Sequence, residues 1–304
     1  MIKNIKIGVS AVASPVVDSE SRKCILKSFK LLSKNFLTAT FIKGKTLRLN
    51  QGWNAGSIKQ RLDDFMKIQK KADVFIAAKG GYGCLDLIDK INYEEIKKAT
   101  KFVGFSDVTA LLLAIYSKTG IVTYHGPDFK KISTIDEESI NKLHSILMDN
   151  SLTIEIPQNS NKSIDALKSD IEGVLIGGNL SVFSALVGTS FLKFNKNKKY
   201  ILFFEDTNQS PPQVDFLLKQ IIIRSPKIMS NNISAIILGN FKNYFVHEYK
   251  NTHKSEMEVF KKYFKIPIIK TGLFGHSQSK FITFPIGAKT KITKDFKKII
   301  FSKK

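Results

Sequence analysis

The sequence predicts an α/β protein in which a parallel-sheet domain is followed by a smaller mixed β/α domain. In the first half of the 304-residue chain, short apolar runs alternate with stretches that have helical spacing. Near the C-terminus this alternation gives way to short β segments broken by Gly and Pro. Strands that alternate with helices form parallel sheets covered on both faces, whereas consecutive β segments favour a mixed sheet.

The first half supplies the alternating elements. Helical spacing is clearest in residues 21–34, where Cys24, Ile25, Phe29 and Leu32 recur on one face. We expect strands at residues 5–13, 40–49, 74–78, 102–105 and 121–124, and helices at residues 21–34, 58–70, from about 85, after 106 and at 136–148. Residues 149–170 are rich in Asn, Ser and Lys, so we interpret them as the connection between domains 1–155 and 156–304.

The second half begins with EGVLIGGN, a strand that meets two glycines and an asparagine before a helix. YILFFEDT is a strongly apolar strand with two carboxylates at its end, and PPQVDFLLKQII begins with proline at a helix start. NISAIILGNF reads as another buried strand. The remaining segment, KIPIIKTGLFGHSQSKFITFPIGAKTKIT, predicts short β segments.

The net charge of +22 raises the question of nucleic-acid binding, but its composition argues against specific recognition. Only four of the 48 basic residues are arginine, the residue that bidentate recognition of bases and phosphates favours. We therefore expect a solvated lysine surface with weak, salt-sensitive adhesion to polyanions, and no specific nucleic-acid partner.

The expected compartment is the cytoplasm. The N-terminus lacks the apolar core of a secretory leader, and no apolar run approaches the roughly 20 residues that span a bilayer. Cys24 and Cys84 are far apart in the chain and offer neither a disulfide framework nor a metal cluster. We expect no metal and no cofactor.

The stretch KFVGFSDVTALLLAIY changes its periodicity at Ser106. A short buried strand precedes this serine, and helical spacing with Asp107 in the first turn follows it. A serine between a strand and a helix is either an N-cap, the commoner role, or a nucleophile held at a sharp turn. The local pattern leaves both hypotheses open.

Other candidate groups follow neighbouring strands. The turn AAKGGYG exposes backbone amides that could bind an anion or form half of an oxyanion hole. Glu205 and Asp206 end the strand YILFF, and an ion pair with lysine is the structural alternative for them. Among the histidines, His276 in a glycine-bounded loop is the best placed base, whereas His125, His144, His247 and His253 favour structural roles.

Taken together, AAKGGYG, VGFSDVTALLLAIY, LIGGNLSVFSALVGT, ILFFEDTNQSP and GLFGHSQSKFITFPIG resemble, in order and spacing, the LD-carboxypeptidases, also called muramoyl-tetrapeptide carboxypeptidases. The resemblance covers nearly the whole chain. It implies a flavodoxin-like or Rossmann-like N-terminal domain, a smaller C-terminal β/α domain and a homodimer. It also implies a serine peptidase that needs no metal and releases D-alanine from murein tetrapeptides in peptidoglycan recycling.

The same resemblance assigns residue roles. It implies that Ser106 is the nucleophile, His276 the general base and Glu205 the acceptor that orients His276. The oxyanion hole falls on the backbone amides of Gly81 and Asp107. The family usually has arginine on both sides of the glycine turn, where this chain has Lys79 and Asp86, so the residues that bind the substrate carboxylate are left unassigned.

Two alternatives are kept. The resemblance extends to immunity hydrolases that cleave peptidyl- or aminoacyl-nucleotide antibiotics of the microcin C type, which are expected to need an aromatic platform for the base. The only tryptophan of this chain is Trp53, in the first domain. A protein of another class, without catalysis, would bind a nucleotide at the glycine turn or RNA through its lysines.

Overall fold

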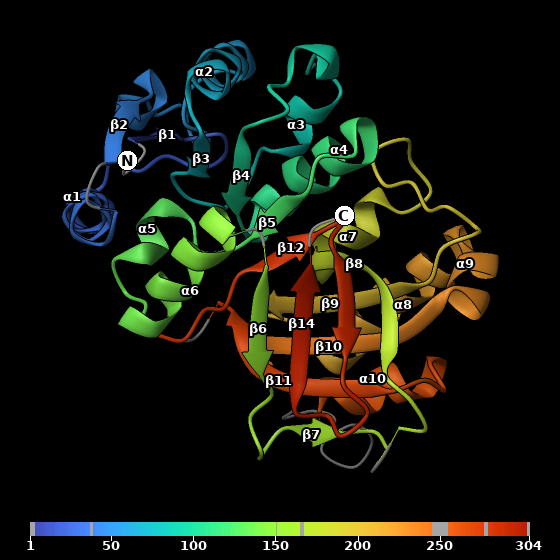
Figure 1. Ribbon diagram of the computed structural model, residues 1–304. Coiled ribbons are helices and arrows are strands. Elements are labelled where there is room, and N and C mark those ends of the chain that lie inside the picture. The colour runs from blue at the N-terminus through green and yellow to red at the C-terminus, as the bar shows by residue number, and fades with distance from the viewer. Residues whose placement is uncertain are drawn as a thin grey trace. The chain divides into compact units, whose positions relative to one another are not determined.

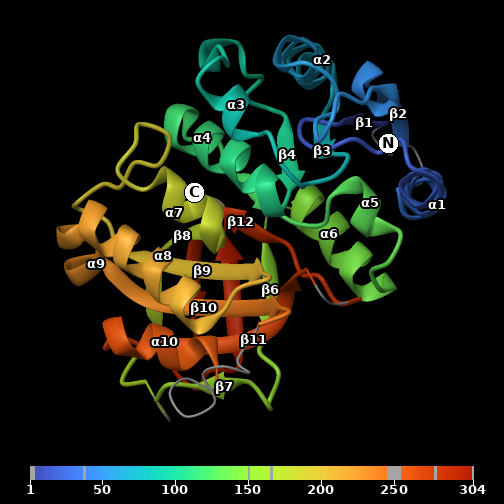
Figure 2. The same ribbon diagram turned by 180° about the vertical axis from the view of Figure 1, so that it is seen from behind.

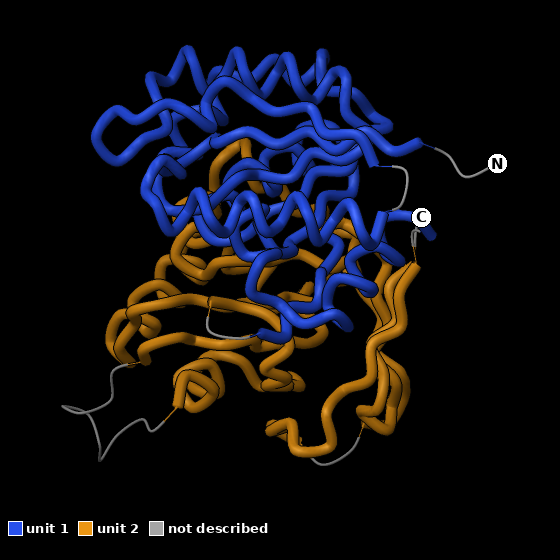
Figure 3. Tube along the Cα trace, turned by 90° about the vertical axis from the view of Figure 1, so that its left-hand side faces the viewer, with its two compact units in different colours: residues 1–149, 279–285 blue, residues 150–278, 286–304 orange. Residues whose placement is uncertain are grey.

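The computed structural model describes residues 4–36, 39–149, 151–164, 167–244, 255–276 and 279–302. The chain forms two compact units (Figure 3). Unit 1 consists of Met1–Asp149 and Ser279–Pro285, and unit 2 of Asn150–Gln278 and Ile286–Lys304. A short stretch from late in the sequence thus belongs with the N-terminal unit.

Unit 1 is built on a six-stranded sheet with the order β12-β5-β4-β3-β1-β2 (Figure 1). Its strands are β1 (Ile5–Ser10), β2 (Ala39–Lys43), β3 (Val74–Ala77), β4 (Lys101–Gly104), β5 (Thr123–His125) and β12 (Phe284–Ile286). Every pairing among β1 to β5 is parallel, as predicted. The order 2-1-3-4-5 is that of flavodoxin-like sheets, in which ligands bind at the carboxyl ends of the strands near β1 and β3.

Helices cover the sheet of unit 1 on both faces (Figures 1 and 2). They are α1 (Ser19–Asn35), α2 (Ile58–Lys71), α3 (Leu85–Ile88), α4 (Thr109–Thr119), α5 (Phe129–Ile132) and α6 (Glu137–Asp149), with 3₁₀ turns η1 (Lys45–Arg48), η2 (Tyr93–Glu95) and η3 (Ser106–Val108). Local chemistry fixes where the helices begin. Asp18 caps α1 by accepting from the Ser21 amide, and Ser57 with Gln60 forms a capping box at α2.

The predicted strand 40–49 was wrong beyond residue 43, where the chain turns into η1. The cause lies in the buried carboxylate of Asp64 on α2. Asp64 accepts hydrogen bonds from the amides of Lys45 and Thr46 (3.1 and 3.0 Å) and from Thr46 Oγ1 (2.6 Å). These contacts hold the backbone in a turn instead of an extended strand. No local sequence pattern predicts them, because Asp64 lies on another element.

Unit 2 contains an eight-stranded mixed sheet with the order β6-β14-β13-β8-β9-β10-β11-β7. Its strands are β6 (Leu152–Glu155), β7 (Asn161–Lys162), β8 (Ile171–Asn179), β9 (Tyr200–Thr207), β10 (Ile233–Lys242), β11 (Ile268–Gly275), β13 (Lys289–Ile292) and β14 (Lys298–Ser302). The four strands β8, β9, β10 and β11 are parallel neighbours, and the outer strands are antiparallel. The predicted mixed β/α character is confirmed.

The helices of unit 2 are α7 (Leu180–Leu186), α8 (Pro211–Arg224), α9 (Pro226–Asn231) and α10 (Glu256–Tyr263). Strand β9 is almost entirely buried, which fits an apolar strand in the middle of a sheet covered on both faces. Two findings differ from the sequence analysis: the expected connection 149–170 contains β6 and β7, and β12 pairs within the sheet of unit 1. Within the described part of the chain, no helix has the length and apolarity that a membrane crossing requires.

Candidate active site

Ser106 occupies a sharp turn between β4 and α4. The preceding residue, Phe105, is extended (φ −152°), whereas Ser106 has φ 58°, a left-handed conformation that costs a non-glycine residue about 1–3 kcal/mol. The N-cap positions belong to Phe105 for η3 and to Val108 for α4. The hypothesis that Ser106 is simply a helix cap was therefore wrong. A strained serine at the carboxyl end of a parallel strand is the geometry of a nucleophile held at a strand-to-helix turn.

The glycine turn that follows β3 approaches Ser106 closely. A Cβ atom added to Gly80 would lie 2.9 Å from Ser106 Cβ and 3.3 Å from Ser106 Oγ. Hydrogen bonds fix the turn: the Gly80 amide donates to Asp128 Oδ2 (3.0 Å), and Ser14 contacts both the Gly80 carbonyl and the Tyr82 amide. The sequence analysis predicted that the glycine turn and Ser106 follow neighbouring strands, and the parallel pairing of β3 with β4 confirms this.

Gly81 and Asp107, the predicted oxyanion donors, lie next to these two turns. Gly81 has φ 111°, a conformation that favours glycine, and an added Cβ would come within 2.1 Å of Ser14 Oγ. The Asp107 carboxylate is held by the Cys84 amide (2.8 Å), and burial raises the pKa of Asp107. Among the described residues, no oxygen accepts a hydrogen bond from the backbone amide of Gly81 or of Asp107.

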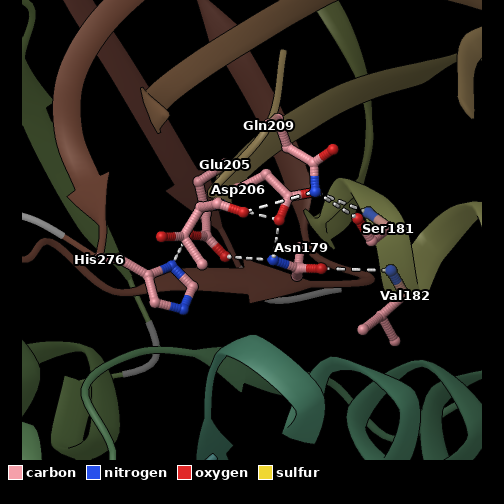
Figure 4. Close-up of polar contacts among 8 residues, drawn as sticks. Asn179, Ser181, Val182, Glu205, Asp206, Gln209 and His276 are labelled. Atoms are coloured by element: carbon pink, nitrogen blue, oxygen red, sulfur yellow. Dashed lines mark hydrogen bonds and ion pairs between the residues drawn. The ribbon is translucent and has the colours of Figure 1, made fainter. Parts of the chain in front are cut away.

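In unit 2, Glu205 and His276 form a close pair (Figure 4). Glu205 is fully buried near the end of β9, and His276 directly follows β11. His276 Nδ1 lies 2.6 Å from Glu205 Oε2. Because a carboxylate only accepts, Nδ1 is the donor in this pair, and in the neutral imidazole the other ring nitrogen, Nε2, is then an acceptor. The fold thus brings together two groups 71 positions apart in the sequence, and the carboxylate fixes the orientation of the imidazole ring.

Asn179 and Asp206 support this pair from one side. Asn179 Nδ2 donates to Asp206 Oδ1 (2.9 Å) and lies 3.5 Å from Glu205 Oε1. Asp206 also accepts from the Ser181 amide (2.9 Å), Ser181 Oγ (2.7 Å) and the Thr207 amide (2.8 Å). Burial, together with the neighbouring Glu205, raises the pKa of Asp206.

Sequence reasoning did not single out Asn179, Ser181 or Gln209, whose Nε2 donates to Ser181 Oγ (3.1 Å). The sequence feature that could have identified Asn179 is its position after two glycines at the end of a strand. In the structure Asn179 caps α7 by accepting from the Val182 amide (3.2 Å).

The two other histidines that the structure describes, His125 and His144, are not part of this cluster. His125 is buried on β5 beside the rings of Phe105 and Phe281. His144 on α6 packs against Phe36. His247 and His253 lie outside the described residues. Across the described ranges, no group of three or more His, Cys, Asp or Glu residues could hold a metal ion.

Comparison with known proteins agrees with this fold along most of the chain. Residues 7–126 match the LD-carboxypeptidase N-terminal domain, and residues 172–292 match the LD-carboxypeptidase C-terminal domain. A probable murein peptide carboxypeptidase of Bacillus subtilis (strain 168) is 31% identical over 182 residues, which span 59% of this chain and 56% of that protein.

Two further proteins are similar over more of the chain. The microcin C7 self-immunity protein of Escherichia coli is 26% identical over 90% of this chain and 84% of its own length. The crystal structure of a muramoyltetrapeptide carboxypeptidase from Oxalobacter formigenes has the same fold, with a TM-score of 0.80 and 22% identity over 97% of each chain. With both domain matches in sequence order, the chain belongs to the LD-carboxypeptidase family of serine peptidases.

Proposed function

We propose that this protein hydrolyses the amide bond between an L-configured centre and a C-terminal D-amino acid, and so releases D-alanine from a murein tetrapeptide. The observation that carries the proposal is the 2.6 Å contact between His276 Nδ1 and the buried Glu205 carboxylate. A histidine oriented in this way is the base that a serine nucleophile requires. The name of the Bacillus subtilis relative supports murein peptide as the substrate.

Ser106, His276 and Glu205 form the catalytic triad in this proposal. Ser106 Oγ attacks the carbonyl carbon while His276 Nε2 takes its proton. The amides of Gly81 and Asp107 donate to the oxyanion, and each such donor contributes on the order of 10²- to 10³-fold in rate. His276 then gives the proton to the departing amine of D-alanine. Water, deprotonated by His276, attacks the acyl-enzyme and regenerates Ser106.

Ser106→Ala tests the proposal directly. A murein tetrapeptide is incubated with wild type and variant, and mass spectrometry follows the release of D-alanine. Loss of the nucleophile is expected to lower kcat by roughly 10⁶-fold. The Ser117→Ala variant, which changes a serine on α4 outside the proposed site, serves as the matched control. Release of D-alanine by Ser106→Ala at the wild-type rate would eliminate this mechanism.

A second candidate function has its own support, because the microcin C7 self-immunity protein is similar over 90% of this chain. The same triad could hydrolyse a peptidyl- or aminoacyl-nucleotide. The comparison of kcat/KM for a murein tetrapeptide and for an aminoacyl sulfamoyl adenylate separates the two functions. A larger value for the adenylate would make immunity-type hydrolysis the function.

The non-catalytic alternative is tested by the same variants. A protein that binds a nucleotide or RNA without catalysis would bind with a steep salt dependence and without dependence on His276. Labelling of Ser106 by a fluorophosphonate, abolished in His276→Ala, would instead support the enzyme. We further propose that the protein acts in the cytoplasm in peptidoglycan recycling and forms a homodimer, which light scattering after size-exclusion chromatography tests.

A further inference from the structure

Two large aromatic side chains are exposed beside the glycine turn of unit 1. Trp53 is 69% exposed and Tyr82 is 58% exposed. Their ring centroids lie 6.5 Å apart with the planes at 80°, an edge-to-face arrangement. Exposed apolar groups that gather at one place mark interaction sites more often than isolated ones do. Tyr82 directly follows Gly81, so the pair adjoins the segment that carries the proposed oxyanion donor.

The backbone around Trp53 is held in place before any ligand binds. Gln51 and Asn54 exchange two backbone hydrogen bonds (2.8 and 3.1 Å), and the Ala55 amide donates to the Ala13 carbonyl (2.9 Å). In the amide orientation that satisfies both partners, Asn54 Nδ2 donates to the Tyr82 carbonyl (2.9 Å) and Oδ1 accepts from Trp53 Nε1 (3.2 Å). The side chain of Asn54 thus ties the two aromatic residues together, which lowers the entropy cost of binding.

A pocket of about 640 Å³ adjoins Trp53, and we call it the Trp53 pocket. Its other lining groups include the polar side chains of Gln51, Asn54 and Ser57. The volume lies within the range of small-molecule sites, and the mixture of an aromatic face with a few polar groups is typical of them.

The charges at the Trp53 pocket are already neutralised. Arg61, which is fully buried, pairs with Asp86 (3.1 Å), and Lys59 pairs with Asp63 (2.6 Å). Each cation that lines the pocket therefore has a carboxylate partner, and Arg61 is buried against Asp86, so it offers a phosphate no exposed positive charge. Arg61 Nε, by contrast, has no acceptor among the described residues. The pocket favours a neutral ligand with hydrogen-bonding oxygens over a nucleotide.

We propose that the Trp53 pocket binds a neutral saccharide ring that carries hydroxyl and acetamido groups. One face of such a ring presents C–H groups with partial positive charge, which suits the negative face of an indole ring. Its hydroxyl and acetamido groups match the amides and the hydroxyl that line the pocket.

The part of the substrate that fills this pocket follows from the proposed function, on which this step rests. The leaving group is a single D-amino acid, so any larger substituent belongs to the acyl part of the substrate. A murein peptide that retains its amino sugar carries that sugar at the N-terminus of the acyl part. The Trp53 pocket therefore makes the enzyme prefer sugar-bearing murein peptides over free peptides.

The first test measures binding without catalysis. Trp53 is the only tryptophan of the chain, so intrinsic tryptophan fluorescence reports on this pocket alone. The full-length protein is titrated with di-N-acetylchitobiose and, separately, with adenosine. A saturable change with the disaccharide and none with adenosine supports the proposal. A response to adenosine alone, or to neither compound, overturns it.

The second test measures kcat/KM for an N-acetylmuramoyl-tetrapeptide and for the free tetrapeptide. We expect wild type to favour the sugar-bearing substrate by roughly 2- to 10-fold, mainly through KM. In Trp53→Ala this ratio should fall to about one. Phe216→Ala, which removes a ring of similar exposure (60%) from α8, should keep the wild-type ratio.

A ratio near one in wild type, or an unchanged ratio in Trp53→Ala, contradicts the proposal. If wild type cleaves neither peptide, the proposed function fails, whereas the fluorescence titration still decides whether the pocket binds the saccharide.

Discussion

The close approach of Gly80 to Ser106 makes Gly80→Ala a sharp test of the nucleophile. An added methyl group would lie 2.9 Å from Ser106 Cβ, a separation that Cβ atoms of real proteins do not tolerate. Ser106 Cβ is bonded directly to Cα, so no rotation of the side chain can move it away from the added methyl group. Ser106 or the glycine turn must therefore shift by several tenths of an ångström, which changes the position of Ser106 Oγ relative to the turn.

The expected magnitude follows from this displacement. Misplacement of a reacting group by about 1 Å lowers the rate by on the order of 10²-fold, so a shift of several tenths of an ångström should lower kcat/KM of Gly80→Ala by roughly 5- to 10-fold. Overpacking a buried site costs about 1–3 kcal/mol of stability, and replacing glycine by alanine returns a few tenths through the unfolded chain. The protein should thus remain folded while its activity drops.

Gly120→Ala is the matched control. Gly120 caps α4 with φ 72°, and an added Cβ there would meet nothing within 4 Å. Its left-handed conformation makes alanine cost about 1 kcal/mol, so the stability loss resembles that of Gly80→Ala. D-alanine release from a murein tetrapeptide and thermal melting are measured for both variants. Wild-type activity in a folded Gly80→Ala, or an equal activity loss in Gly120→Ala, would refute the reasoning.

Two further variants test other parts of the structure. Glu205→Gln keeps the size of the buried side chain but offers His276 Nδ1 an amide donor in place of a carboxylate. We therefore expect kcat to fall by roughly 10²- to 10⁴-fold with little change in melting temperature. A wild-type kcat would contradict the role of Glu205. Although burial opposes it, hydrogen bonds from Lys219, Lys262 and Tyr263 hold the pKa of Asp215 well below its usual range. The resulting stability, about 1 kcal/mol, is complete above the unfolded pKa near 3.8 and is lost as pH falls toward the folded pKa. Denaturant unfolding from pH 2.5 to 7 should therefore show Asp215→Asn less stable than wild type at pH 7, by a difference that shrinks as pH falls below about 3.8, whereas a constant difference would count against this account.

The sequence predicted the parts of the fold that local patterns encode. The alternation of buried strands with amphipathic helices specifies the parallel sheet of unit 1, because strand burial and helical spacing both repeat within a few residues. The strand-to-helix change at Ser106 was predicted for the same reason. Its left-handed backbone was not, since serine seldom adopts that conformation and no neighbouring residue demands it.

Features that depend on distant parts of the chain escaped prediction. Strand β12 joins the sheet of unit 1 from far along the sequence, and its three residues resemble the β segments around them. The support that Asn179 and Asp206 give to Glu205 depends on the parallel register of β8 with β9, in which Asn179 lies opposite Glu205. A single sequence does not reveal register between strands of this kind, because side chains of both strands are apolar over most of their length.

The return of residues 279–285 to unit 1 affects how the protein can be divided. The chain passes between the units three times, at residues 149–150, 278–279 and 285–286. A gene fragment that stops near residue 150 would encode unit 1 without β12, which exposes β5 as a sheet edge and removes the ring of Phe281 from Phe105 and His125. Separate expression of unit 1 therefore requires the segment 279–285 to be grafted onto its C-terminus.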